Sequence, residues 1–251
     1  MKKIRVTVWN EFYHERKAEH VRAIYPEGIH GFVKGFLDAN DDMEVRAVSL
    51  YDPDNGLPDE VLNNTDVLMW WGHVKHHEVP DELVEKIRQR VYRDGMGMVF
   101  MHSGHHSKAF RAILGCTGNL AWGDNMPAVV WNMMPTHPIA QGIPACFDLE
   151  CEELYSEPFF VPKPEDLIFA SWYPNGNLFR SGMTYRRGQG KIFYFQPGHE
   201  ECKSFYNPYV QRILTNGIRW VNPGEITVPE ESPYVDCGYI KTNKENAEEE
   251  K

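Results

Sequence analysis

The sequence feature that most constrains the fold is an alternation of strand-like and helix-like segments along the first half of the chain. Four short runs rich in β-branched and apolar residues are typical of strands, namely 4–9, 45–50, 67–71 and 98–101. Between them, apolar residues recur at the spacing of one helix face, as in Ile29, Phe32, Val33, Phe36 and Leu37, and in Leu83, Val84, Ile87 and Val91. This alternation predicts an α/β fold, with a doubly wound, mostly parallel sheet and helices on both faces.

The second half of the chain is less regular. Its strand candidates are residues 128–131, 167–172, 178–185 and 191–195. The last two are separated by Arg187-Gly188-Gln189-Gly190, which is typical of a hairpin turn, so an antiparallel extension is expected at one edge of the sheet. Residues 1–222 are predicted to form a single domain. Residues 223–251 are predicted to be a Pro- and Glu-rich tail that is disordered from about residue 243.

Charge and cysteine usage narrow the function class. The formal net charge of −10 argues against nucleic acid as a partner, because that binding depends on Lys and Arg neutralising phosphates. No apolar run approaches the roughly 20 residues of a membrane helix, and no export signal is predicted from the N-terminal residues. The five cysteines form no C-x-x-C pair, which favours reduced thiols over a disulfide framework or a thiolate zinc site. A cytoplasmic protein that uses neither a membrane nor nucleic acid is expected.

Polar side chains follow four of the predicted strands. They are Glu11 and His14 after the first, His73 after the third, His102, Ser103 and His105 after the fourth, and Gln196, His199 and Glu200 after the last. Ligands of open α/β sheets bind outside the carboxyl ends of the strands, so these residues are expected to share one pocket. His30, in the first turn of the first predicted helix, is a further candidate.

Other histidines and the tryptophans are assigned structural roles. His20, in a charged run, and His137, before a proline, are predicted to be solvated surface residues. The tryptophans are expected in the core rather than as ligand platforms, although a tryptophan at a strand end can stack on a sugar face; they include Trp9, Trp70, Trp71 and Trp122.

The histidines also predict a metal site. Imidazole nitrogens suit zinc, iron, nickel or copper, and His73, His102 and His199 are the expected ligands of one divalent metal, with zinc as the first choice. The pair His73 and His77 would share a face only if a helix formed there. The alternative is that these histidines only hydrogen-bond sugar hydroxyls. No nucleotide cofactor is expected, because the sequence has neither a Gly-x-Gly-x-x-Gly nor a Walker A loop.

Five short segments together resemble the ThuA-like family, which takes its name from trehalose utilisation. They are Trp9-Asn10-Glu11-Phe12-Tyr13-His14-Glu15, Gly28-Ile29-His30-Gly31, Trp70-Trp71-Gly72-His73, His102-Ser103-Gly104-His105-His106 and Phe195-Gln196-Pro197-Gly198-His199-Glu200. The likeness covers about residues 3 to 222. It implies a flavodoxin-like sheet related to class I glutamine amidotransferases, and a role in the metabolism of disaccharides or oxidised sugars.

The same resemblance argues against amidotransferase chemistry. In those enzymes a nucleophilic cysteine occupies a strand-to-helix turn of the form Gly-x-Cys-x-Gly-His. Here the matching turn runs from Met101 to His105 and has His102 at the cysteine position. Thiolate acyl transfer therefore lacks its nucleophile.

The leading hypothesis is an enzyme that acts on a sugar or keto-sugar, of the isomerase or lyase type. General acid–base catalysis is assigned to Glu11, His102, His105 and His199, and substrate binding to His14, His30, Ser103, Gln196 and Glu200. The alternative is a non-catalytic carbohydrate-binding or regulatory module on the same fold. The expected partners are a small-molecule sugar and further copies of the chain.

Overall fold

The computed structural model describes residues 2–224 and is built on one nine-stranded sheet in the order β2-β1-β3-β4-β9-β8-β7-β5-β6. Five strands are parallel: β1 (Ile4–Asn10), β2 (Met43–Ser49), β3 (Val67–Trp71), β4 (Gly97–Met101) and β9 (Gly190–Phe195). In sequence order they follow the 2-1-3-4-5 pattern of flavodoxin-like sheets. The predicted α/β fold with a mostly parallel sheet is confirmed.

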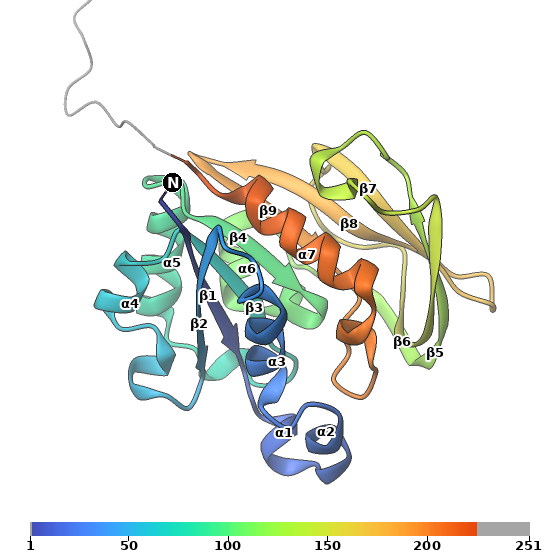
Figure 1. Ribbon diagram of the computed structural model, residues 1–251, viewed down its shortest axis with the longest axis horizontal. Helices are drawn as coiled ribbons and strands as arrows, with labels where there is room; N and C mark the ends of the chain where they lie inside the picture. The colour runs from blue at the N-terminus through green and yellow to red at the C-terminus, as the bar shows by residue number, and fades with distance from the viewer. Residues whose placement is uncertain (1, 225–251) are drawn as a thin grey trace, which may run out of the picture.

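Helices cover both faces of the parallel strands, as Figure 1 shows. They are α1 (His14–Lys17), α2 (Glu19–Ile24), α3 (Gly28–Leu37), α4 (Asp59–Asn63), α5 (Asp81–Tyr92), α6 (Lys108–Leu114) and α7 (Pro208–Val221). The α3 and α7 helices pack on one face of the sheet, and α5 and α6 on the other. α1 and α2 lie at the carboxyl ends of the parallel strands. The apolar stripes predicted for α3 and α5 are the buried faces of these helices.

The core lies between the central strands and their helices. Every residue of β3 and β4 is buried, which explains their uninterrupted apolar character. Trp9 and Trp70 are buried and stack with their ring centroids 3.8 Å apart, so the predicted core role of both is confirmed. The prediction for Trp122 was wrong, because this side chain is 71% exposed.

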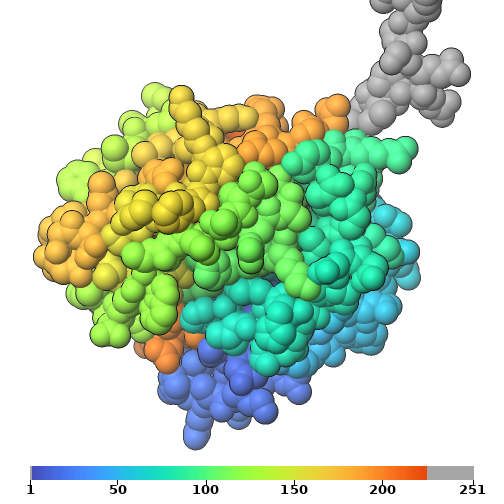
Figure 2. Space-filling view, turned by 180° about the vertical axis from the view of Figure 1, so that it is seen from behind, coloured from blue at the N-terminus to red at the C-terminus, as the bar shows by residue number. Residues whose placement is uncertain are grey.

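The predicted antiparallel extension is confirmed. It consists of β5 (Ala121–Asn132), β6 (Cys146–Ser156), β7 (Asp166–Trp172) and β8 (Leu178–Arg187), with β8 joined to β9 through the predicted hairpin. Seen from behind, the green to orange atoms of this second half of the chain lie against the blue and teal atoms of the first half (Figure 2). Sequence reasoning missed β6 altogether and began β5 too late. The acidic residues of β6 hid an alternation in which Phe147 and Leu149 face inward.

Two further predictions concern the cysteines and the C-terminal tail. Cys151 and Cys202 form a disulfide, because β6 and the loop after β9 lie side by side in space although 51 residues separate them in sequence. The expectation of reduced thiols was therefore wrong for this pair. The tail predicted over 223–251 lies, beyond residue 224, outside the described residues. Among residues 2–224, no helix is long and apolar enough to cross a membrane.

Candidate functional site

The loops after β3, β4 and β9 meet at one edge of the sheet, because these strands are direct neighbours. Four side chains from these loops each offer a ligand atom, and the four atoms lie within 4.8 Å of one another. They are His73, His102, His199 and Glu200, here named the His–Glu cluster. Three of the four are buried and the fourth, His73, is half-buried. The structure thus brings together the three histidines proposed from the sequence as metal ligands.

Glu200 contacts three histidines. A carboxylate oxygen lies 2.8 Å from Nδ1 of His73 and 3.3 Å from Nδ1 of His14, and the other lies 3.5 Å from Nε2 of His199. Burial alone would raise the pKa of Glu200, but the hydrogen bond with His73 and the nearby imidazoles lower it far below its ordinary value. Glu200 is therefore a carboxylate at neutral pH.

His102 occupies the turn directly after β4 with a left-handed backbone, at φ 50°. Its fully buried ring donates through Nδ1 to the carbonyl of Gln196 at 3.2 Å, and Nε2 lies 3.1 Å from Oε2 of Glu153. Within the described residues, neither Nε2 nor this oxygen makes a hydrogen bond of normal geometry. Buried polar atoms normally have a partner, so this pair of atoms marks a position where a ligand would be held.

Two consecutive glutamates of β6 complete the site, and sequence reasoning missed both. Glu152 is fully buried and accepts hydrogen bonds from the backbone N–H of Gly198 at 2.7 Å and of His199 at 3.1 Å, and from the Ser204 hydroxyl at 2.6 Å. Burial raises the pKa of Glu152. This carboxyl group therefore holds the loop that carries His199. No local sequence signal identifies both glutamates, because alternation along a strand directs only one of two consecutive residues inward, whereas Glu152 and Glu153 are both buried.

Glu11 has a different role from the one predicted. Its buried carboxylate accepts the backbone N–H groups of His73, Val74 and Lys75 at 2.8–3.1 Å. Both oxygens are used in these bonds, so the geometry favours a structural role over the predicted general-base role. Glu11 is instead a positioning residue, which holds the loop after β3 and with it His73.

The remaining candidates divide into cavity residues and structural ones. Ser103 hydrogen-bonds to the Tyr155 hydroxyl at 2.7 Å, and His105 donates through Nδ1 to the Gly118 carbonyl at 2.6 Å. Burial lowers the pKa of His105 well below its ordinary value, so this ring is neutral. The buried Gln196 side chain donates to the Glu153 backbone carbonyl at 3.1 Å, which makes it part of the wall behind the site.

Other predicted residues lie apart from the cluster. His30 contacts the Asn10 side chain at 3.0 Å in a separate buried network, so the structure does not bring it to the site. The segment that begins at His76 is only a short 3-10 turn, and the side chain of His77 is 72% exposed, which excludes a shared helical face with His73. His137 is buried and caps a short turn at the Ile139 N–H, so the surface prediction for it was wrong.

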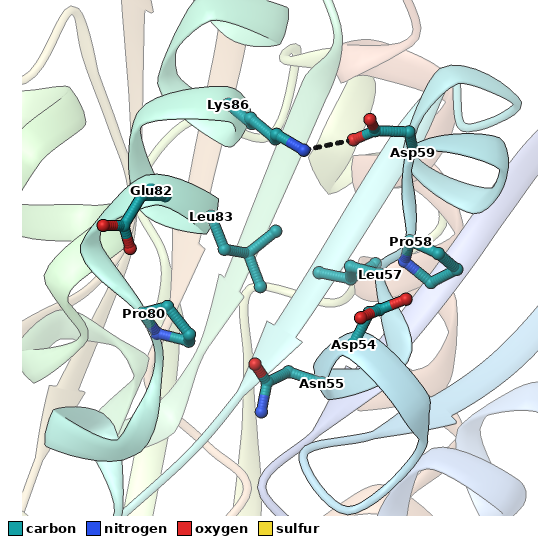
Figure 3. Close-up of a pocket in the computed structure, with 9 residues that line it drawn as sticks. All are labelled: Asp54, Asn55, Leu57, Pro58, Asp59, Pro80, Glu82, Leu83 and Lys86. Carbon is teal, nitrogen blue, oxygen red and sulfur yellow. Dashed lines mark hydrogen bonds and ion pairs between the residues drawn. The ribbon is translucent and has the colours of Figure 1, made fainter.

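A cavity of about 370 Å³ opens beside the cluster, a size typical of small-molecule sites. Its lining includes His73, Ser103, His105, Glu153 and Tyr155, with Val74, His106, Leu120 and Trp122 completing the wall. Figure 3 shows a second cavity, of about 320 Å³, between residues 54–59 and 80–86. That cavity is spanned by an exposed ion pair between Lys86 and Asp59 at 2.5 Å, and none of its lining residues is a histidine.

Comparison with known proteins agrees with this architecture. The family model described as ThuA, trehalose utilisation, matches residues 5–221. A ThuA-like protein from Parabacteroides merdae is 17% identical, with a TM-score of 0.67 over 92% of this chain and 95% of that chain. A ThuA-like protein from Bacteroides uniformis is 18% identical, with a TM-score of 0.61 over 88% and 95%. A protein from Salmonella typhimurium described as cytoplasmic is 13% identical, with a TM-score of 0.56 over 87% and 99%.

These identities establish a shared fold and leave the chemistry to the residues of the site. No curated protein is significantly similar to the chain.

Proposed function

Because the chain belongs to the ThuA family of trehalose-utilisation proteins, we propose that it is an enzyme of carbohydrate metabolism that acts on a sugar or keto-sugar. We further propose that the His–Glu cluster holds one divalent metal ion. The observation that carries the proposal is the convergence of four ligand atoms within 4.8 Å, next to a cavity of suitable size.

The donor set suits a transition metal. Three imidazoles and one carboxylate are the ligands that zinc and its neighbours prefer, and Nε2 of His102, which makes no well-formed hydrogen bond within the described residues, fits a ligand atom. Burial, as the largest effect, lowers the pKa of His199 to about 4, so its ring is neutral and has a free lone pair at pH 7. The carboxylates around His102 outweigh burial and raise its pKa, so metal binding would compete with protonation of His102.

The chemistry expected at this site is proton transfer next to a carbonyl group. A bound metal would polarise the carbonyl of a keto-sugar. Glu153 lines the cavity, and although burial opposes ionisation, its contact with His102 lowers its pKa, so Glu153 is ionised at neutral pH. Its carboxylate can accept the proton from the carbon beside the carbonyl to give an enediolate. Returning that proton to the neighbouring carbon gives isomerisation, whereas breaking the C–O bond at the β-carbon, with the proton going to the departing oxygen, gives elimination. Glu153 thus takes the role that the sequence suggested for Glu11.

Deuterium exchange tests this function without requiring a full turnover. The metal-loaded protein is incubated in D₂O with trehalose, maltose, cellobiose and their keto derivatives, and NMR follows loss of the proton next to the carbonyl. We expect the metal-loaded protein to catalyse deuterium exchange in a keto-sugar. This exchange should disappear after chelation of the metal and in the Glu153→Gln variant. It should persist in Glu78→Gln, which changes an exposed glutamate. A sugar that binds without exchange would favour the binding-module alternative. Exchange that survives chelation would refute the metal.

A further inference from the structure

The cavity beside the His–Glu cluster carries the most exposed tryptophan of the described residues. Trp122 is 71% exposed, compared with 47% for Trp131 on the same strand. An indole is a large apolar surface, and a ligand that covers it removes this surface from water, which favours binding. Because Trp122 lines a cavity that also reaches His73 and Glu153, the occupant of that cavity is the natural cover.

Strand pairing fixes the direction of this side chain. Trp122 on β5 is paired directly with Tyr155 on β6, and residues opposite each other in an antiparallel pair point to the same face of the sheet. Tyr155 is buried in the cavity wall, where its hydroxyl meets that of Ser103. The Trp122 indole therefore projects from the same face of the sheet as Tyr155, and the two side chains belong to one wall of the cavity.

The cavity has an apolar part and a polar part. Trp122, Leu120 and the half-exposed Val74 supply apolar surface, whereas Ser103 and Glu153 supply hydrogen-bonding groups close to the cluster. A pyranose ring with equatorial hydroxyls has the same division, because its axial C–H bonds form an apolar face and its hydroxyls lie around the edge. Aromatic side chains bind such faces by stacking.

The cavity offers no Lys or Arg side chain to an anionic ligand. None of its lining residues is Lys or Arg, and it contains the carboxylate of Glu153, with that of Glu200 in the adjacent cluster. With one divalent metal ion bound, the two carboxylates balance its charge, so a phosphate or carboxylate group on the sugar would gain no net attraction.

We propose that Trp122 is the stacking platform for an uncharged, gluco-configured pyranose ring, which it holds with its polar edge toward the His–Glu cluster. This inference rests on the proposed function and names its substrate class: neutral glucosides and their keto derivatives, rather than sugar phosphates or uronic acids.

Calorimetric titration of the metal-loaded protein tests the platform. The probes are trehalose, methyl α-D-glucopyranoside, methyl α-D-galactopyranoside, whose axial hydroxyl interrupts one C–H face, and glucose 6-phosphate. We expect the glucosides to bind, and Trp122→Ala to weaken them about tenfold, which corresponds to about 1.4 kcal/mol. Trp122→Phe should retain part of the affinity. Trp131→Ala, which removes an exposed tryptophan outside the cavity, should leave the affinity within about twofold of the wild-type value.

The outcomes separate this inference from the proposed function. Unchanged glucoside affinity in Trp122→Ala, preferential binding of glucose 6-phosphate, or no binding of either glucoside would each overturn the platform, even if metal binding and deuterium exchange were present. Conversely, glucoside binding could depend on Trp122 although the protein binds no metal and catalyses no deuterium exchange. This result would support the platform and refute the proposed enzyme. Metal content is measured for every variant, so that a damaged cluster is not mistaken for a lost stacking contact.

Discussion

Nε2 of His102 lies 3.1 Å from Oε2 of Glu153, and both atoms are buried without a well-formed hydrogen bond among the described residues. The two atoms contact each other as an ion pair, and buried polar atoms that lack a well-formed hydrogen bond are stabilised further when a ligand binds them. The pair also joins the parallel sheet, which carries His102, to the antiparallel extension, which carries Glu153. The candidate site is thus formed where the two parts of the sheet face each other.

The backbone of His102 has the left-handed conformation that favours glycine. A glycine substitution therefore removes the side chain without adding backbone strain, so that effects on stability and on metal binding can be measured separately. The left-handed region costs a residue with a Cβ about 1 kcal/mol relative to glycine. We expect His102→Gly to be at least as stable as His102→Ala in urea unfolding, while both lose metal binding. A glycine variant that is clearly less stable than the alanine variant would show that strain at this turn is not significant.

Glu11 is expected to act on stability and metal affinity together. Glu11→Gln replaces one acceptor oxygen with an amide that faces backbone N–H groups, and should lower the free energy of unfolding by roughly 1–3 kcal/mol. Because the loop carrying His73 is then loosened, zinc affinity should fall as well. The exposed Glu78→Gln is the matched control. Normal stability and metal affinity with lost deuterium exchange would restore a catalytic role for Glu11.

Glu152 is expected to position His199. Glu152→Gln leaves at least one of three buried donors without a proper acceptor, so thermal unfolding should shift to lower temperature, and zinc should bind more weakly. Glu150→Gln, at an exposed position of the same strand, should change neither property. If Glu152→Gln were to unfold and bind zinc like the wild-type protein, the positioning role would be wrong.

The half-buried His76 should make the fold sensitive to acid. Burial, followed by the nearby His106, lowers the pKa of His76 from 6.5 to about 3. As the pH falls, His76 is therefore protonated in the unfolded chain before it is protonated in the folded protein. This difference lowers the free energy of unfolding as the pH falls from about 6.5 toward 3 and has no effect at higher pH. Urea unfolding at several pH values should show a shallower loss for His76→Gln than for His77→Gln, its exposed neighbour. Parallel curves for the two variants would contradict this.

Much of the parallel sheet could be predicted from the sequence, because strands buried on both faces and amphipathic helices leave clear patterns. The run 67–71 and the α3 stripe are examples. The convergence of His73, His102 and His199 also followed from a topological rule, since parallel strands end at the same edge.

The glutamates and the platform could not be predicted in the same way. Glu152 and Glu153 reach the site on an edge strand, 50 or more residues from His102 in sequence, through a pairing that no local pattern reveals. The role of Glu11 depends on three backbone N–H groups, which have no sequence signature. Trp122 was assigned to the core because composition alone does not show that its neighbours enclose a cavity.

Cobalt titration of chelator-treated, untagged protein tests the central claim, that the His–Glu cluster holds a metal, most directly. We predict visible d–d absorption that saturates at about one equivalent, as expected for a nitrogen and oxygen ligand set, and that is lost in His199→Ala and retained in His77→Ala. Circular dichroism confirms that the variants are folded. Binding of less than about a tenth of an equivalent, or identical spectra in His199→Ala and the wild-type protein, would contradict the account.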